Sequence, residues 1–204
     1  VLKYFNYEKP DLEKEEIIFG YAGVITFERG INKLLQVSVS VANKFPQKKF
    51  KLLIFGRFTF QNEEVEFKQI VSTINNLKVE FTEWTDYDKM SSVIERMDIC
   101  FDLRNRNFIY SNSLPIKIFE YMACGKPFIY SDIKPIRNEM DFKKFGFLID
   151  PENEKEIVSA IESYLNNPNL AYQHSMNARK IIEDNKNWES ESKKLIDLVS
   201  KLLM

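Results

Sequence analysis

The chain has 204 residues, which is enough for one sizeable domain and short for two. Hydrophobic residues make up 44% and charged residues 29%, proportions that are ordinary for a globular domain. The formal net charge is -1, so the chain lacks the basic surplus of nucleic-acid-binding proteins, and no nucleic-acid partner is expected. No apolar run reaches the roughly 18 residues that a transmembrane helix needs.

Short apolar runs alternate with segments of helical periodicity over most of the chain. The expected strands cover residues 17–23, 50–55, 79–81, 98–103, 126–130 and 145–149. The expected helices between them cover residues 30–44, 63–74, 86–97 and 115–123, and three more follow at 154–165, 169–184 and 188–203. This order predicts an α/β, Rossmann-like three-layer domain with a parallel sheet and a C-terminal helical tail.

The N-terminal residues 1–16 are rich in mixed charges and are expected to form a linker, so that the domain proper covers residues 17–204. Cys100 and Cys124 lie in apolar or helical surroundings and are expected to be buried thiols, which suits a reducing cytoplasm. In parallel sheets, ligands bind outside the C-terminal ends of the strands. The loops to inspect therefore follow residues 23, 55, 81, 103 and 130.

The first of these loops, residues 23–30, combines a strand end, a cation at Arg29 and a helix start. Backbone N–H groups at a helix N-terminus, together with a cation, form a natural anion site. The alternative is a plain connecting loop with a surface arginine.

The second segment, residues 111–127, carries good helix caps in Ser-Asn-Ser at 111–113 and a proline suited to a first helical turn at Pro115. The amides of Ile116 and Lys117 would then be free to meet a phosphate. Glu120 lies about one turn further along and could accept hydrogen bonds from a ribose diol. The alternative is a capped helix with an exposed glutamate.

The same segment resembles a family signature. Residues 118–129 read I-F-E-Y-M-A-C-G-K-P-F-I, which is similar to the E-A/Y-M-A-C-G-K-P-V-V string of the group-1 (family-4) retaining glycosyltransferases of GT-B fold. Further similarities to that family follow in the correct order at residues 23–30, 51–56, 98–103, 146–151, 177–179 and 188–189. The resemblance covers residues 17–203 and implies the C-terminal, nucleotide-sugar-binding half of such an enzyme.

The resemblance also implies roles for single residues. Glu120 matches the second glutamate of the family's E-x7-E motif, which holds the ribose of the donor nucleotide. The helix start at residues 115–117 matches the backbone that holds the diphosphate, and Arg29 matches the basic residue that pairs with the phosphates. Trp84 and Thr85 match the loop that brackets the base.

Several positions depart from the family pattern. Asn112 stands where the first glutamate of the motif is expected, and Ser113 stands at a glycine position. Val24 replaces an arginine, so one phosphate cation is missing, and we expect Lys117 or Arg104 to replace it. Asn112 is then expected to hydrogen-bond sugar hydroxyls rather than to act as a carboxylate.

The implied reaction is glycosyl transfer from a nucleotide sugar, UDP-linked more often than GDP-linked. Arg29 and Lys117 are the expected catalytic residues because they would stabilise the charge that develops on the departing diphosphate. The reaction needs no metal or other cofactor, and no metal-ligand cluster is evident in the sequence. The only histidine, His174, lies in the helical tail and is expected to be a packing residue.

Acceptor binding in the family belongs to an N-terminal domain that this chain lacks, so the isolated chain is expected to turn over weakly or not at all. The helix from Trp188 is expected to face that domain, or to mediate a homodimer in its absence. Family habit implies bacterial surface-polysaccharide or glycoconjugate synthesis in the cytoplasm, with any attachment to the inner face of the membrane made through the missing domain.

Two alternatives stay open from the residues alone. One is a sugar-nucleotide epimerase-like domain, whose site needs several carboxylates and a histidine. The other is a non-catalytic nucleotide-binding module, for example a flavodoxin-like or receiver-like domain. A receiver would need an acidic cluster after its first strand, where this chain offers Glu28 and Arg29.

Overall fold

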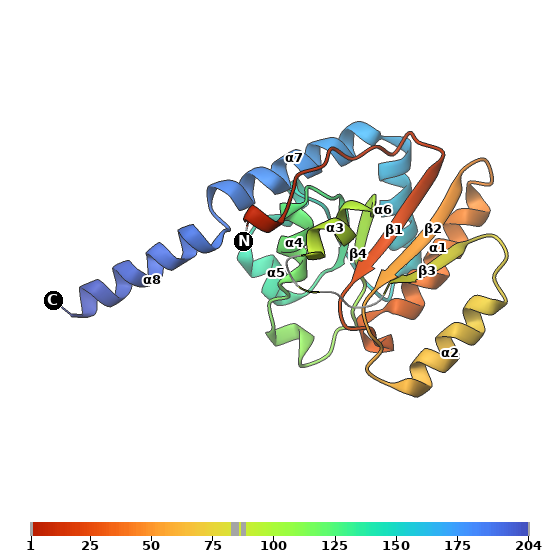
Figure 1. Cartoon of the computed structure of the whole chain (residues 1–204), viewed down its shortest axis with the longest axis horizontal. Helices are drawn as coiled ribbons and strands as arrows, with labels where there is room; N and C mark the ends of the chain where they lie inside the picture. The colour runs from red at the N-terminus through yellow and green to blue at the C-terminus, as the bar shows by residue number, and fades with distance from the viewer. Residues whose placement is uncertain (1, 83–85, 87–88, 204) are drawn as a thin grey trace.

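The computed structural model describes residues 2–82, 86 and 89–203 (Figure 1). Its centre is a sheet of six parallel strands in the order β3-β2-β1-β4-β5-β6. The strands are β1 (Glu16–Ala22), β2 (Lys49–Phe55), β3 (Lys78–Thr82), β4 (Ile99–Asp102), β5 (Phe128–Ser131) and β6 (Phe147–Ile149). Because β4 returns to the far side of β1, the strand order reverses between these two strands.

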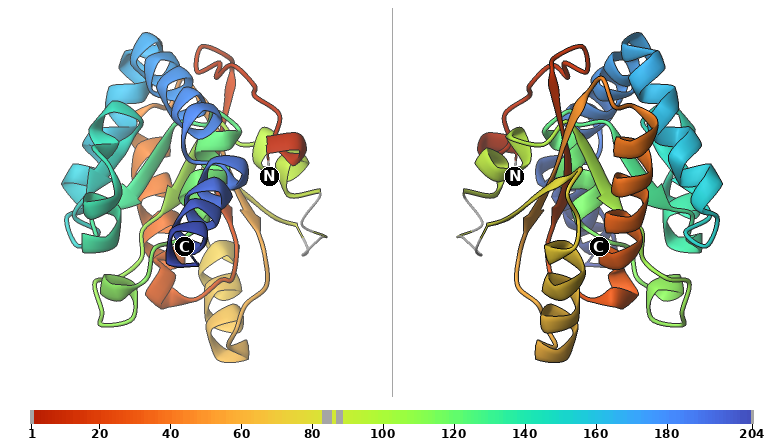
Figure 2. Two further views of the ribbon diagram at one scale, coloured as in Figure 1. Left: turned by 90° about the vertical axis from the view of Figure 1, so that its left-hand side faces the viewer. Right: turned by 90° about the vertical axis from the view of Figure 1, so that its right-hand side faces the viewer.

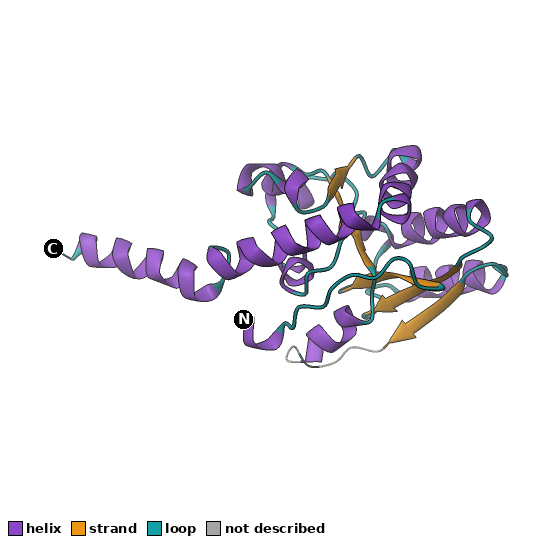
Figure 3. Cartoon of the chain, turned by 90° about the horizontal axis from the view of Figure 1, so that it is seen from above, coloured by secondary structure: helices purple, strands orange, loops and turns teal. Residues whose placement is uncertain are grey.

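Helices cover both faces of the sheet (Figures 2 and 3). One face packs against α1 (Ile31–Lys44), α2 (Gln61–Ser72) and α6 (Glu154–Asn166). The other face packs against α3 (Met90–Glu95), α4 (Lys117–Ala123), α5 (Lys134–Glu139) and α7 (Pro168–Asp184). The last helix, α8 (Trp188–Leu202), follows α7. The three-layer, Rossmann-like α/β fold expected from the sequence is therefore confirmed.

The central strands explain why the sheet needs two helical layers. In β2, Leu52 and Ile54 join the core on the α1 side, whereas Leu53 and Phe55 join the core on the α4 side. All four side chains are buried. A strand that is apolar on both faces is stable only when both faces are covered, which is the pattern of parallel sheets.

The structure shifts the ends of several expected elements. α4 begins at Lys117 rather than at Pro115, and no side chain caps it, so residues 111–113 do not act as its N-cap. α6 is capped by the side chain of Asn153, which accepts a hydrogen bond from the Glu156 amide. α5 has no counterpart among the expected helices.

The chain before β1 packs on the domain. Phe5 and Leu12 are buried in the two cores. The Arg179 guanidinium in α7 donates to the backbone carbonyls of Phe5 and Ala123, and so joins this segment to the C-terminal end of α4. Glu8 forms an ion pair with the buried Lys126.

The C-terminal helix α8 extends away from the three layers (Figures 1 and 3). Its residues include no buried side chain, and an apolar stripe that contains Leu195, Val199 and Leu202 is exposed. Within the described part of the chain, no helix is long and apolar enough to cross a membrane. Cys100 on β4 and Cys124 at the end of α4 are both free and buried.

Candidate functional site

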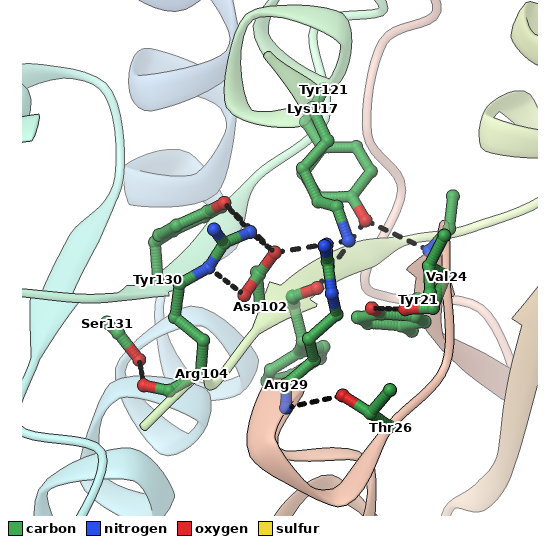
Figure 4. Close-up of polar contacts among 12 residues, drawn as sticks. Tyr21, Val24, Thr26, Arg29, Asp102, Arg104, Lys117, Tyr121, Tyr130 and Ser131 are labelled. Atoms are coloured by element: carbon green, nitrogen blue, oxygen red, sulfur yellow. Dashed lines mark hydrogen bonds and ion pairs between the residues drawn. The ribbon is translucent and has the colours of Figure 1, made fainter. Parts of the chain in front are cut away.

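The candidate site lies where the strand order reverses. The loop after β1, residues 23–30, and the connection after β4, residues 103–116, both leave the C-terminal edge of the sheet there. This is the position at which open α/β sheets bind their ligands. Figure 4 shows charged and phenolic side chains gathered between these two segments and α4.

Asp102, the last residue of β4, is the centre of this cluster. Its side chain is fully buried, and Arg104 donates to both of its oxygens, from Nε to Oδ1 at 2.8 Å and from Nη2 to Oδ2 at 2.5 Å. The Tyr130 hydroxyl donates to Oδ2 at 2.9 Å and accepts from Arg104 at 2.9 Å. Arg104 is therefore held in a buried, bidentate ion pair.

Lys117, in the first turn of α4, brings a second cation to the same carboxylate. Its Nζ lies 3.1 Å from Oδ2 of Asp102 and 4.0 Å from the ring centroid of Tyr21. Among the described residues, no acceptor meets this buried Nζ with good hydrogen-bond geometry, so the contact with Asp102 is chiefly electrostatic. The ammonium thus keeps unused donors at the edge of the site.

The loop of residues 23–30 lies directly against these groups. A Cβ at Gly23 would come within 2.7 Å of the Lys117 Nζ. Gly30 has a φ of 76°, and a Cβ there would lie 2.1 Å from the carbonyl oxygen of Leu103. Only glycine permits this close approach between the two segments.

Arg29 ends a short 3-10 helix within this loop and is half-buried. Its guanidinium lies 5.6 Å from the ring centroid of Tyr110, and that of Arg104 lies 5.0 Å from the same ring. Figure 4 shows the Arg29 side chain rising toward the Asp102–Lys117 pair. In this cluster three cations face one carboxylate, an excess of two positive charges that suits a diphosphate.

The protonation states follow from burial and charge. Burial alone would raise the pKa of the Asp102 carboxyl, but Lys117 and Arg104 outweigh it and hold that pKa well below its ordinary value. Burial would lower the pKa of Arg104, yet Asp102 raises it above its ordinary value. Burial raises the pKa of Tyr130 well above its ordinary value. At neutral pH the carboxylate and the guanidinium are charged and this phenol is neutral.

Glu120 lies one turn after Lys117 and faces a different part of the edge. It lines a groove of about 420 Å³ between α4 and the α7–α8 junction, together with Ile116 and Trp188. The Ile116 side chain is 71% exposed.

Asn112 and Ser113 are exposed, and the Asn112 amide donates to the carbonyl of Phe108 within its own loop. The structure therefore brings Arg29, Arg104 and Lys117 together, whereas the Asn112 amide makes its hydrogen bond within its own loop. Trp84 and Thr85, expected to bracket the base, lie outside the described residues.

Sequence reasoning missed Asp102 and Tyr130. A charged residue at the end of an apolar strand is itself a signal, because a carboxylate in such a place needs a buried partner. The sequence does not show that Arg104, two residues on, folds back to be that partner. Among the described residues, no group of three or more His, Cys, Asp or Glu side chains could hold a metal ion.

Comparisons with known proteins assign the chain to a family. The family model described as "Glycosyl transferases group 1" matches residues 4–200. An uncharacterized glycosyltransferase of Haemophilus influenzae is 26% identical over 162 residues, which cover 76% of this chain and 41% of that protein. The chain thus spans about two fifths of the length of this curated relative.

Two solved structures show the same fold. The C-terminal domain of the group 1 glycosyl transferase LpcC from Francisella tularensis has a TM-score of 0.73 at 14% identity, covering 92% of this chain and 98% of that domain. Anabaena Alr3699/HepE in complex with UDP-glucose has a TM-score of 0.76 at 15% identity, covering 98% of this chain and 55% of that protein. With a family match over nearly all of its length, this chain belongs to the group 1 glycosyltransferases.

Proposed function

We propose that this chain is the nucleotide-sugar-binding half of a glycosyltransferase, and that the Asp102–Arg104–Lys117 cluster with Arg29 holds the donor diphosphate. The observation that carries the proposal is the Lys117 ammonium, which is buried at the switch point of the sheet without a hydrogen-bond acceptor among the described residues. Phosphate oxygens are acceptors of matching charge.

Lys117 rather than Arg104 fills the place of the missing cation in this proposal. The guanidinium of Arg104 is already engaged in hydrogen bonds to Asp102 and to the Tyr130 hydroxyl, whereas the Lys117 ammonium has no such bond among the described residues. Arg29 is half-buried and supplies the second cation from the facing loop. Both would stabilise the negative charge that grows on the departing diphosphate, which is the catalytic role we assign to them.

The remaining contacts of the donor are assigned as follows. Glu120 accepts hydrogen bonds from the ribose hydroxyls, and the backbone at Ile116 lies beside the diphosphate. UDP is the preferred nucleotide, because HepE, whose fold this chain shares, forms complexes with UDP and UDP-glucose. Asn112 and Ser113 stay at the sugar side of the rim, where Asn112 would have to leave its contact with Phe108 to reach the sugar.

A second domain outside this chain would supply the acceptor site, so the isolated chain should bind nucleotide and transfer sugar weakly or not at all. The exposed apolar stripe of α8 supports this, since an unpaired stripe of this kind marks an interaction surface. A homodimer through α8 is the alternative use of the same surface. We place the enzyme in bacterial surface-polysaccharide or glycoconjugate synthesis in the cytoplasm, with any membrane contact made by the other domain.

Calorimetric titration with UDP, GDP and uridine tests the proposal. We expect saturable binding of UDP and weaker binding of uridine. Glu120→Gln should weaken UDP and uridine alike, by about tenfold, because it removes a charge-assisted hydrogen bond to the ribose. Glu191→Gln, which changes another carboxylate that lines the same groove, is the matched control. Failure of wild-type protein to bind UDP or GDP, or equal effects of the two substitutions, would refute the proposal.

A further inference from the structure

The two cations at Asp102 are held very unequally. Arg104 makes two directed hydrogen bonds to the carboxylate and a third to the Tyr130 hydroxyl, which itself donates to Oδ2. Lys117 approaches the same Oδ2 to 3.1 Å without hydrogen-bond geometry. Asp102 can release Lys117 and still remain paired with Arg104. Release of Arg104, in contrast, would leave the buried charges of Asp102 and Arg104 poorly compensated.

Lys117 is also the partner that is able to move. Its ammonium rests on the Tyr21 ring and against Gly23, at the end of a flexible four-carbon side chain. The exposed surface of the Nζ is negligible, so the ammonium cannot meet a ligand where it lies. A change of side-chain rotamer would carry it from beneath the loop of residues 23–30 toward the rim.

We propose that the Asp102 carboxylate and the diphosphate of the donor compete for the Lys117 ammonium, so that Lys117 exchanges one counter-ion for the other when the nucleotide binds. This inference rests on the proposed function, because it requires that a diphosphate occupies the site. Asp102 is then a positioning residue that acts through Lys117. Its charge lowers the affinity for the nucleotide and draws the lysine back when the nucleoside diphosphate product leaves.

The exchange predicts a gain of affinity from the loss of a charge. Asp102→Asn removes the competitor, so UDP should bind about tenfold more tightly, while uridine, which has no phosphate, should bind as before. In a Lys117→Met background the same Asp102→Asn change should alter UDP binding by less than about twofold, since no lysine is left to compete for. Calorimetry with UDP and uridine on these four proteins measures the coupling directly.

Two outcomes would overturn the exchange while leaving the proposed function intact. One is that Asp102→Asn raises the affinity for UDP equally with and without Lys117, because such a result would reflect only the general loss of a negative charge. The other is weaker UDP binding in a folded Asp102→Asn protein, which means that the carboxylate only shapes the site. If wild-type protein binds neither UDP nor GDP, the proposed function fails and the exchange fails with it.

Asp102→Asn leaves two buried cations close together. If that variant does not fold, a milder variant tests the exchange. Tyr130→Phe removes the hydroxyl that donates to Oδ2 and leaves that oxygen freer to hold Lys117. UDP binding should then weaken by about threefold in the wild-type background and stay unchanged with Lys117→Met. Unchanged or tighter binding in Tyr130→Phe with Lys117 present would contradict the exchange.

Discussion

Lys117→Met separates the charge of the lysine from its packing. The methionine side chain fills much of the same volume but carries no ammonium. Asp102 keeps its hydrogen bonds from Arg104 and Tyr130, so the free energy of unfolding should change by no more than about 1 kcal/mol. The variant should therefore fold, and its nucleotide affinity can be compared directly with that of wild-type protein.

The expected loss of affinity follows from the charges. A phosphate and an ammonium about 4 Å apart attract each other by about 4 kcal/mol at an effective dielectric constant near 20. Lys117 gives up its ion pair with Asp102 to make that contact, and this offsets about half of the gain. A net loss of about 2 kcal/mol corresponds to roughly thirtyfold weaker binding of UDP. Uridine should be affected little.

A second buried lysine provides the matched control. Lys126 is 2% exposed, just before β5, and pairs with Glu8 and the Glu95 carbonyl. It precedes β5 and so lies at the N-terminal side of that strand, away from the loops after β1 and β4. Lys126→Met should cost stability and leave UDP affinity unchanged in calorimetry. Equal losses of UDP affinity in both variants, or an equal loss for uridine and UDP in Lys117→Met, would refute the reasoning.

Two further changes test the stability of the fold. Gly30→Ala forces a side chain into a left-handed backbone position and to within 2.1 Å of the Leu103 carbonyl oxygen, so urea unfolding should show a loss of at least about 2 kcal/mol. Burial lowers the pKa of His174, the only histidine, so the folded state disfavours its charged form. The free energy of unfolding is therefore highest above the unfolded pKa of about 6.5. It falls as the pH drops from there through the lower folded pKa, by at most about 1.4 kcal/mol per pH unit, because only the unfolded state then takes up the proton. Unfolding free energies at pH 7.5 and 5.5 should show this fall, and His174→Gln should reduce it; an unchanged slope in that variant would exclude the histidine as its source.

The secondary structure was largely predictable because strands and helices leave different apolar periods. The run at residues 50–55 is uninterrupted, and the helix at 154–165 repeats its apolar positions every three or four residues. The short helix α5 was not predicted because it buries a single apolar side chain, Ile136, and one position shows no period. Phe5 and Leu12 were missed for a related reason, since an irregular segment packs single side chains without any repeat.

The candidate site was predictable in its place but only partly in its contacts. Topology brings the loops after β1 and β4 to one edge, so Arg29, Arg104 and Lys117 could be expected to lie near one another. Which cation makes hydrogen bonds to Asp102 and which only approaches it depends on side-chain directions, and sequence spacing does not fix these. The motif position predicts Asn112 as a site residue, and the sequence does not show that a hydrogen bond within its own loop competes for its amide.

The two buried thiols can report on local and global unfolding of the chain. Burial raises the pKa of Cys124 to about 12 and that of Cys100 well above its ordinary value, so neither is a thiolate at neutral pH. Alkylating reagents can therefore react only with protein molecules in which local or global unfolding has exposed a thiol. Cys124 lies beneath the N-terminal segment, whose Glu8 amide donates to its carbonyl, whereas Cys100 lies in the central sheet. Different labelling rates at the two sulfurs would separate local detachment of that segment from unfolding of the sheet.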